Sequence, residues 1–488
     1  MKTIKNNYIY KAVFSGCLLA VSFLPACKED FLDVDPQGQA RSEDFFQTQE
    51  HALQAVNAIY GNLREYKIAA FPHLVLTHVT SDNAEKGSDP GDAGFVNDYD
   101  NFTFTSTQFF LADYWNGHYQ GINLANQALF NIPNISMDQN LQQRLLAEAK
   151  FLRAHHYFTL VRAYGDVPLL TQPPQTAEEI NPVRTPKQEV YQQIIKDLTE
   201  AAAVLPPSYN AMNVGRATRG AALTLLAKVQ LYQRNWSEVL RLTNEVRGLG
   251  YSLTPDFYQV FRIAGENNSE SIFEVQAVTL PGNCGASNSQ WAEVQGVRGQ
   301  FGWGFAIPTE DLVNAFEPND KRMEATVLFR GEVTPEGEQI NPNAPNPRYN
   351  QKAYVPGFVS RDCGYGKDQN IRLLRFAEVL LMQAEAANEL GQTDDALAAV
   401  NLVRNRAGLA NLTVRDQTAL RNAIWKERRL ELALESGDRF FDLVRQGRAA
   451  QVLQAQGKQF REGVNEVFPI PQNQIDLSGG TLTQNPGY

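Results

Sequence analysis

The side chains best suited to chemistry lie in two stretches that are rich in aromatic and polar residues and lack helical patterning. Their candidate site residues are Asp82, Asn83, Phe95, Asn97 and Tyr99 in the first stretch, and Trp291, Arg298, Phe301 and Trp303 in the second. Aromatic rings cover the apolar faces of a ligand, while carboxylate, amide and guanidinium groups bond its polar rim. The two stretches therefore indicate ligand recognition.

Motifs of the common catalytic sites do not occur in the sequence. It contains no His-Glu-x-x-His, Gly-x-Ser-x-Gly or Walker A motif, and no cysteine pairs at zinc spacing. Carboxylates are plentiful, but a sequence does not give the separation of the two that a glycoside hydrolase needs. The adjacent His155 and His156 would point in different directions on a helix, which favours packing or hydrogen bonding over metal binding. We expect no cofactor, no metal and no catalytic residue.

The elements that must position the two stretches are predicted to be helical. The segment Ile371–Gly408 contains two runs of apolar residues spaced three and four apart, separated by Gly391 and opened again by the candidate cap Thr393. This pattern predicts a helical hairpin. Ala384 and Ala396 lie where a tetratricopeptide-type (TPR) repeat, about 34 residues long, needs small side chains.

A second hairpin is predicted over residues 221–246. Ala227 aligns with Ala384, and Trp236 falls where such repeats commonly have an aromatic residue at the turn. A single helical hairpin has no special meaning, but two copies favour a scaffold of stacked helix pairs. Scaffolds of this kind bind partners and rarely catalyse.

Further helices are predicted at Phe45–Tyr66, Phe109–Phe130, Leu141–Tyr164, Thr185–Leu205 and Gln417–Leu443. Trp115 is expected in the helical core. The charged run Trp425–Arg429 is typical of a solvated face, although Glu427 and Arg429 could also pair with neighbouring helices. Ser271–Val278 resembles a short strand. The predicted fold is mainly α: a TPR-like helical-hairpin scaffold with a large loop-rich insertion that carries the ligand face.

Composition divides the chain into four expected parts. These are a lipoprotein signal peptide at 1–26, an N-terminal helical, TPR-like part at 27–250 with a ligand loop near 69–106, an irregular loop-rich insertion at 251–370, and a C-terminal part at 371–488 with a TPR-like hairpin, helices and closing loops.

The first residues form an export signal. Three lysines precede an apolar run, 12–24, that is too short to span a bilayer comfortably. The run ends in Leu24-Pro25-Ala26-Cys27, which resembles the lipobox of bacterial lipoproteins. We expect cleavage before Cys27 and lipid on its thiol, which would tether the protein to a membrane. The alternative is an ordinary secretory signal that leaves Cys27 as a free thiol.

The charge of the chain excludes some partners. The net charge is −10, and loss of residues 1–26, with three lysines and no acidic residue, takes it to −13. An acidic protein is a poor ligand for nucleic acid or for an anionic membrane face. Of the remaining cysteines, Cys284 and Cys363 could pair in an oxidising compartment, but the sequence leaves this open.

Several segments together resemble the SusD/RagB family of surface lipoproteins. They are 149–170 (AKFLRAHHYFTLVRAYGDVPLL), Ile371–Gly408, Pro308–Arg322, Glu427–Gly447, Phe468–Ile475 and the closing Asn485–Tyr488, together with the lipobox. The resemblance covers nearly all of the mature chain. One departure is Ser436-Gly437-Asp438-Arg439, where the family more often has a shorter Gly-x-Arg. Lys28-Glu29-Asp30 also looks like the acidic tag that directs such lipoproteins to the cell surface.

The resemblance implies a role in nutrient uptake. Family members bind glycans in many cases and peptides in some, and they partner a SusC-like TonB-dependent transporter at the outer membrane. Family ligand sites fall broadly in the two stretches that carry our candidate residues. Pyranose rings have apolar C–H faces and polar rims, which aromatic and polar side chains match. We therefore expect an oligosaccharide or polysaccharide ligand, with a peptide as the alternative and a surface glycoside hydrolase as the less favoured one.

Two tryptophans of the second stretch are expected to differ. Trp291 follows a run of turn residues and lies between Gln290 and Glu293, so it lacks an apolar run to join and is expected to stack on ligand. Trp303 lies in a Gly-Trp-Gly setting before Pro308, which favours a structural role.

Overall fold

The long helices form where the spacing of apolar residues predicts them. The computed structural model describes residues 45–488 apart from 181–182, 281–283, 360–362 and 364–365, and residues 48–488 form one compact unit. The long helices are α3 (Gln49–Asn62), α7 (Phe109–Asn131), α8 (Gln139–Tyr164), α10 (Lys187–Val204), α11 (Arg219–Tyr232), α12 (Trp236–Arg247), α16 (Phe376–Glu389), α17 (Thr393–Arg406) and α18 (Gln417–Leu432). Side-chain caps define where several of them begin: Asp138 accepts from the Leu141 amide, and Asp416 from the Ala419 amide.

Short helices occupy the connections and the loop-rich part. They are α4 (Tyr66–Ala69), α5 (Phe71–Leu74), α6 (Val96–Asp100), α9 (Ala177–Ile180), α13 (Trp291–Gln295), α14 (Glu310–Ala315), α15 (Arg322–Thr326), α19 (Arg439–Arg445), α20 (Ala449–Ala455) and α21 (Gln472–Leu477). A π-helix, η3 (Val75–Val79), leads into the first candidate stretch.

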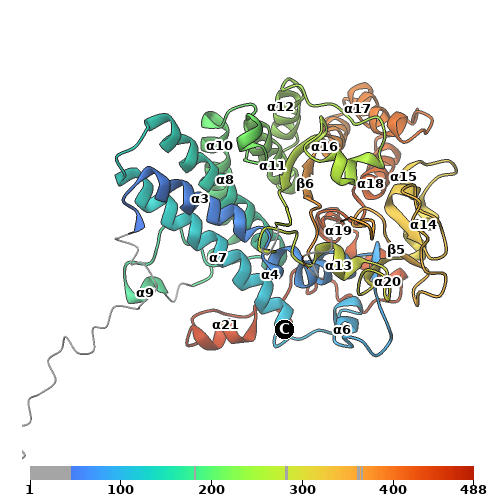
Figure 1. Ribbon diagram of the computed structural model, residues 1–488, viewed down its shortest axis with the longest axis horizontal. Coiled ribbons are helices and arrows are strands. Elements are labelled where there is room, and N and C mark those ends of the chain that lie inside the picture. The colour runs from blue at the N-terminus through green and yellow to red at the C-terminus, as the bar shows by residue number, and fades with distance from the viewer. Residues whose placement is uncertain (1–44, 181–182, 281–283, 360–362, 364–365) are drawn as a thin grey trace, which may run out of the picture. The chain divides into compact units, whose positions relative to one another are not determined.

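The long helices form a continuous array (Figure 1). Helix α3 packs on α7, α7 on α8, α8 on α10, α10 on α11, α11 on α12, α12 on α16, and α16 on both α17 and α18. The two hairpins predicted from sequence, α11–α12 and α16–α17, are therefore neighbours through α12 and α16, although more than a hundred residues separate them. Ala227, Ala384 and Ala396 are fully buried. The mainly helical, TPR-like fold is confirmed.

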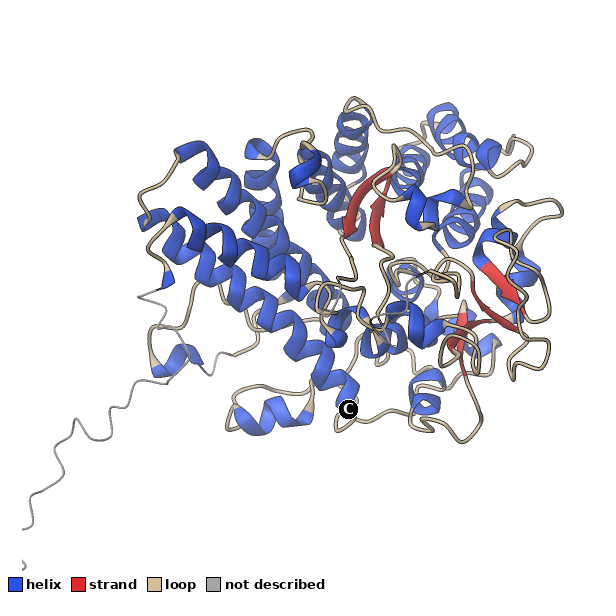
Figure 2. Cartoon of the chain, viewed as in Figure 1, coloured by secondary structure: helices blue, strands red, loops and turns tan. Residues whose placement is uncertain are grey.

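The described residues form three short antiparallel strand pairs, one of which, β2 with β6, lies among the helices beside α11 and α16 (Figure 2). They are β1 (Ala84–Gly87) with β3 (Phe305–Pro308), β2 (Ser271–Val275) with β6 (Ile371–Arg375), and β4 (Val327–Phe329) with β5 (Arg348–Asn350). Strand β2 confirms the strand-like run, which ends earlier than expected. The disulfide between Cys284 and Cys363, left open by the sequence, is formed across a Cα–Cα distance of 5.1 Å.

Several predicted helix boundaries are wrong. Residues 371–375 belong to strand β6, so the helix begins only at Phe376, and the cap of the next helix is Gln392 rather than Thr393. The helix predicted over 417–443 is two helices, α18 and α19. The break contains Gly437 at φ +79°, where a Cβ would collide with Thr77 of η3, so the close approach of these elements requires glycine.

The charged run of α18 does not form a solvated face. Glu427, Arg428 and Glu431 are buried. Glu431 accepts from Arg375 of β6 at 3.0 Å and from Arg406 of α17 at 2.5 Å, and Arg375 also bonds Glu435 at 2.7 Å. A helical pattern cannot distinguish solvated charges from charges paired across elements, and here the buried ion pairs join α18 to α17 and to β6.

Two further expectations about the helical part hold. Trp115 is buried, with its ring against Tyr119 and Tyr164. His156 is hydrogen-bonded, its Nδ1 lying 3.0 Å from Nδ1 of His118 on α7. Among the residues that the structure describes, no helix combines the length and apolar character needed to cross a membrane.

Candidate ligand-binding face

The two candidate stretches meet although about two hundred residues separate them. Strand β1 pairs with β3, placing Gly87 opposite Phe305, and the Ser88 amide donates to the Gly304 carbonyl at 2.6 Å. Gly87 has φ +67°, and a Cβ there would strike the Gly304 carbonyl oxygen. We call the surface formed by residues 87–95 and 298–304 the loop junction.

A guanidinium group holds the loop junction together. Arg298 Nε lies 2.5 Å from an Asp89 carboxylate oxygen, and its Nη1 lies 2.7 Å from Asp92. Nη1 also donates to the Trp303 carbonyl at 3.3 Å. All three charged side chains are partly exposed. Charged groups that are mutually oriented yet accessible are suited to bonding the hydroxyl groups of a ligand.

Aromatic rings extend from the loop junction to the start of α7. The Trp303 ring packs edge-on against Phe71 at 6.2 Å between centroids, and Phe71 contacts Phe110 at 5.1 Å. Phe110 in turn contacts Phe95 at 5.2 Å, and Phe95 contacts Phe109 at 4.8 Å. We call these five residues the aromatic row. Its inner rings are buried, Trp303 and Phe95 are half-buried, and Phe109 is 53% exposed.

Four of the nine candidate residues are buried, so we do not include them in the candidate site. They are Asp82, Asn83, Tyr99 and Trp291, each at most 5% exposed. The other five, Phe95, Asn97, Arg298, Phe301 and Trp303, are partly or fully exposed. Tyr99 stacks on Phe104 at 5.5 Å, which occupies a face that a ligand would need.

Asp82 and Asn83 anchor the first stretch to the scaffold. Two nitrogens of Arg439 donate to the Asp82 carboxylate at 2.6 and 2.7 Å, and Arg429 approaches it to 3.1 Å. Arg429 Nε also donates to Asn83 Oδ1 at 2.8 Å. Burial alone would raise the pKa of Asp82, but the two guanidinium groups outweigh it and lower the pKa to about 2. Asp82 is therefore a charged clamp between η3 and helices α18 and α19.

The expectation that Trp291 has no apolar surface to pack against is wrong. Its indole starts α13 and packs against His73 and His78, with ring centroids at 6.2 and 6.0 Å. It lacks an apolar run in sequence, yet η3 and α5 supply the surface that buries it. Trp303, expected to be structural, is the more exposed of the two tryptophans.

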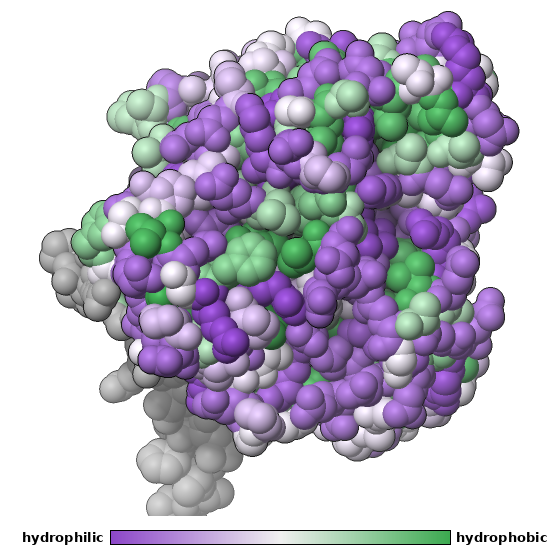
Figure 3. All heavy atoms as spheres, turned by 90° about the vertical axis from the view of Figure 1, so that its right-hand side faces the viewer, coloured by the Kyte–Doolittle hydropathy of each residue, from purple (hydrophilic) through white to green (hydrophobic). Residues whose placement is uncertain are grey.

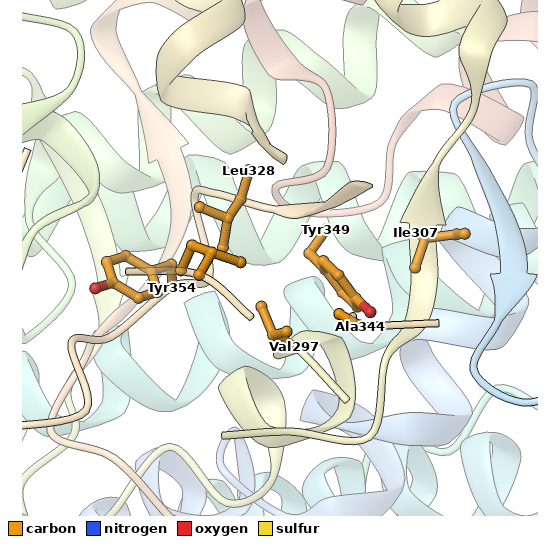
Figure 4. Close-up of a cluster of buried hydrophobic side chains, with 7 residues drawn as sticks. Val297, Ile307, Leu328, Ala344, Tyr349 and Tyr354 are labelled. Atoms are coloured by element: carbon orange, nitrogen blue, oxygen red, sulfur yellow. The ribbon is translucent and has the colours of Figure 1, made fainter. Parts of the chain in front are cut away.

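Phe301 lies on the inner side of the second stretch. Its ring packs at 5.4 Å from Tyr354, against a buried cluster that forms the core of the loop-rich part (Figure 4). The cluster consists of Val297, Ile307, Leu328, Ile340, Ala344, Tyr349 and Tyr354. This core fixes the backbone on which Arg298 and Trp303 stand.

Sequence reasoning missed Asp89, Asp92 and Phe109. The two acids lie in a Gly- and Pro-rich loop, which is a turn signal, but nothing in the sequence connects them to Arg298. Phe109 begins a helix and was assigned to its pattern. Asn97 is exposed and donates to the Gly94 carbonyl at 3.0 Å, so it remains beside the aromatic row.

One face of the molecule is chiefly hydrophilic (Figure 3). Figure 3 shows the face at the right of Figure 1, where hydrophobic surface appears only in patches between polar side chains. No group of three or more His, Cys, Asp or Glu side chains that could hold a metal ion occurs in the described ranges. The loop junction thus offers stacking and hydrogen bonding to a ligand.

Comparison with known proteins gives consistent matches. A family model described as "SusD family" matches residues 243–488, and one described as "Starch-binding associating with outer membrane" matches residues 30–231. The chain is 29% identical to SusD-like protein P2 of Formosa agariphila, over 98% of this chain and 99% of that protein.

Solved structures also match. A laminarin-binding SusD-like protein superposes with a TM-score of 0.80 at 31% identity, covering 91% of this chain and all of its own. Surface glycan-binding protein A from Bacteroides thetaiotaomicron, in complex with laminarihexaose, superposes with a TM-score of 0.77 at 25% identity, covering 90% of this chain.

Proposed function

Because the chain belongs to the SusD/RagB family, we propose that it is a surface lipoprotein that binds a glycan and passes it to a TonB-dependent transporter. The glycan binds at the loop junction and along the aromatic row. Cys27 carries lipid and anchors the protein to the outer membrane, with the body facing outward. Cys27 lies outside the described residues, so this part rests on its lipobox and on the outer-membrane description of the second family match.

The observation that carries the proposal is the arrangement of Trp303, Arg298 and Phe109. Trp303 and Phe109 present partly exposed rings, connected through buried rings that hold them in place. Arg298, with its partners Asp89 and Asp92, supplies donors and acceptors beside them. A pyranose ring needs an apolar platform and several polar groups at its edge, and the surface offers both.

Laminarin is the first ligand to test. Two structural matches, at 31% and 25% identity, are described as binding laminarin or as bound to laminarihexaose. Arg298, the cationic side chain of the loop junction, is held by the two carboxylates Asp89 and Asp92, so it is not free to pair with an acidic polysaccharide. The excess of one carboxylate disfavours an anionic ligand and is compatible with a neutral glucan.

One part of the helical array provides the surface for the transporter. The helix pairs form a side of the molecule that does not include the loop junction (Figure 1). The ligand and the transporter therefore need not compete for the same surface. Stacked helix pairs generally act as binding surfaces for proteins. Co-purification of a SusC-like transporter with the lipidated protein would support this arrangement, and its absence from cells that grow on the glycan would oppose it.

Calorimetry with variants tests the ligand site. Trp303→Ala and Phe109→Ala should each weaken laminarihexaose binding, by up to about thirtyfold if the ring is a hot spot of about 2 kcal/mol. Phe130→Ala is a matched control, because Phe130 is 46% exposed and lies at the opposite end of the same helix. It should bind as the wild type does. Equal affinities for all three variants would place the site elsewhere.

The same samples test two alternatives, a peptide ligand and glycoside hydrolase activity. If the ligand is a peptide, a panel of neutral and acidic polysaccharides gives no heat while peptides do. If the protein is a glycoside hydrolase, incubation with the bound polysaccharide produces new reducing ends. The proposed function predicts bound sugar that stays uncleaved.

A further inference from the structure

A pocket lies in the helical array, apart from the loop junction. It has a volume of about 350 Å³ and lies between the turn that joins α11 to α12, the end of α16, the first half of α18, and the end of α19. We call it the scaffold pocket. It is lined by two tryptophans, Trp236 and Trp425, and shares no residue with the loop junction. Its volume is within the range of small-ligand pockets.

The floor of the scaffold pocket is a buried ion pair. Arg445 Nη1 and Nη2 donate to the two oxygens of Glu385 at 2.6 and 2.9 Å, and these side chains are only 6% and 2% exposed. The indole Nε1 of Trp425 donates to Glu385 at 3.0 Å. Arg448 lies over the Trp425 ring at 5.6 Å from its centroid. Trp425 is therefore held in one orientation before any ligand arrives, which lowers the entropic cost of binding.

Two of the arginines that line the scaffold pocket are held by carboxylates. Arg421 donates to both oxygens of Glu389, at 2.5 and 2.7 Å. Arg445 has a second partner in Asp442, at 2.7 Å from Nε. Arg234 also lines the pocket, where it is exposed and donates to the Arg445 carbonyl at 2.8 Å. An anionic ligand that bound Arg421 or Arg445 would have to displace their carboxylates, whereas a neutral ligand leaves both ion pairs intact.

One buried acceptor of the pocket has no partner. The Oε1 atom of Gln446 is inaccessible to solvent and accepts no hydrogen bond from any residue that the structure describes. Leaving a buried acceptor unsatisfied is unfavourable, because the atom has lost its water without gaining a donor. If the Gln446 amide turns toward the pocket, a ligand hydroxyl can donate to this oxygen and satisfy it.

We propose that the scaffold pocket binds one neutral pyranose ring, as a second saccharide site of this protein. The ring stacks between Trp236 and Trp425, and one of its hydroxyls donates to Gln446. A hydroxyl group both donates and accepts, so the sugar can bond Gln446 and the polar rim without a net charge. The inference rests on the proposed glycan-binding function and extends it.

Two sites on one chain would change how long polymers bind. A polysaccharide that spans both sites binds more tightly than a short oligosaccharide, because the second contact is intramolecular. A hexasaccharide too short to bridge the sites occupies them independently. The scaffold pocket thus adds affinity for polymer over oligomer.

The test uses the indole N–H resonances of the full mature chain, labelled with ¹⁵N on tryptophan and assigned by single Trp→Phe variants. The probes are laminarihexaose, maltohexaose and cellohexaose at millimolar concentration. We expect the Trp236 and Trp425 resonances to shift with at least one probe. Gln446→Leu, which removes the acceptor at similar volume, should weaken this response at least fivefold and leave the response of Trp303 unchanged.

The outcomes separate the two proposals. Shifts at Trp303 alone overturn the scaffold pocket and leave the loop junction intact. Shifts at Trp236 and Trp425 alone support the scaffold pocket and count against the loop junction. Unmoved resonances at all three tryptophans with every probe overturn both sites. An unchanged response of Gln446→Leu would overturn the role of that acceptor, and with it the argument for a sugar hydroxyl.

Discussion

The clamp at Asp82 gives the sharpest prediction about how the fold supports the site. Asp82 is 1% exposed and accepts from Arg439 and Arg429. Asp82→Asn removes the charge but keeps the shape of the side chain, so it leaves the two buried guanidinium groups facing an amide. The segment held by this clamp leads directly into β1, which carries the first half of the loop junction.

The size of the effect follows from the pKa. Arg439 and Arg429, acting against burial, lower the pKa of Asp82 from 3.8 to about 2. This difference corresponds to about 2.5 kcal/mol in favour of the charged carboxylate in the folded state. Breaking a buried ion pair by removing one partner typically costs about 3–5 kcal/mol. We therefore expect Asp82→Asn to lose about 2.5–5 kcal/mol, a decrease in Tm of about 3–5 °C for a unit of this size.

The pH dependence supplies a second check. The folded-state pKa of Asp82 is depressed, so its stabilisation is present above about pH 4 and is lost as the pH falls towards about 2. The Tm values of wild type and Asp82→Asn should therefore differ at neutral pH and converge at about pH 2. Hydrogen exchange at neutral pH should show faster exchange of the β1 amides in the variant, and laminarihexaose should bind more weakly.

A matched control is the same substitution in an exposed pair. Asp394 and Arg415 form an ion pair with side chains 81% and 67% exposed. Exposed pairs of this kind contribute little, so Asp394→Asn should leave Tm, β1 exchange and binding as in the wild type. If Asp82→Asn behaves like Asp394→Asn, the clamp does not hold the site and the reasoning from its pKa is refuted.

Three further predictions concern the scaffold, a buried histidine and the anchor. Ala384→Phe overpacks a fully buried helix crossing and should cost about 1–3 kcal/mol, while Gln392→Ala should not; equal Tm values would refute the close packing. Burial lowers the pKa of His156 to about 3 in the folded state. The free energy of unfolding is therefore unaffected by this group above its ordinary pKa of 6.5, and it decreases by about 2 kcal/mol by pH 5, because the unfolded state binds a proton there. Burial also lowers the pKa of His73, His78, His118 and His155, so His156→Gln should reduce the fall in Tm between pH 7 and 5 without abolishing it; a profile parallel to the wild type would contradict this. Cys27→Ala should move the protein from the membrane to the soluble fraction, and retention would count against the lipid anchor.

The sequence predicted the helical part of the fold well because its signals are local. The apolar spacing of 376–389 and the small residues Ala227 and Ala384 depend on one helix and its neighbour, and both alanines are buried as expected. The end of the α18 pattern was missed because Gly437 serves a contact with Thr77 of a distant element. Likewise, 371–375 shows an apolar pattern compatible with a helix, but pairing with β2 makes it a strand.

The site was predicted by region and only in part by residue. The prediction was right for three residues at the loop junction: Arg298, Trp303 and Phe95. It succeeded there because aromatic and charged residues in loops of this composition are often exposed. Asp82 and Trp291 were misplaced because their partners, Arg439 and His78, come from segments far away in sequence. Contacts between charges and rings far apart in sequence decide which polar and aromatic side chains stay accessible. The local spacing of hydrophobic residues carries no information about such contacts.

The most direct test of the central claim is a crystal structure of the protein with laminarihexaose, or with whichever oligosaccharide calorimetry shows to bind. The account predicts density for a sugar ring against Trp303 or Phe109, with hydroxyls within hydrogen-bonding distance of Arg298, Asp89 or Asp92. Sugar density that lies only on another surface, with the loop junction occupied by water, would contradict the account.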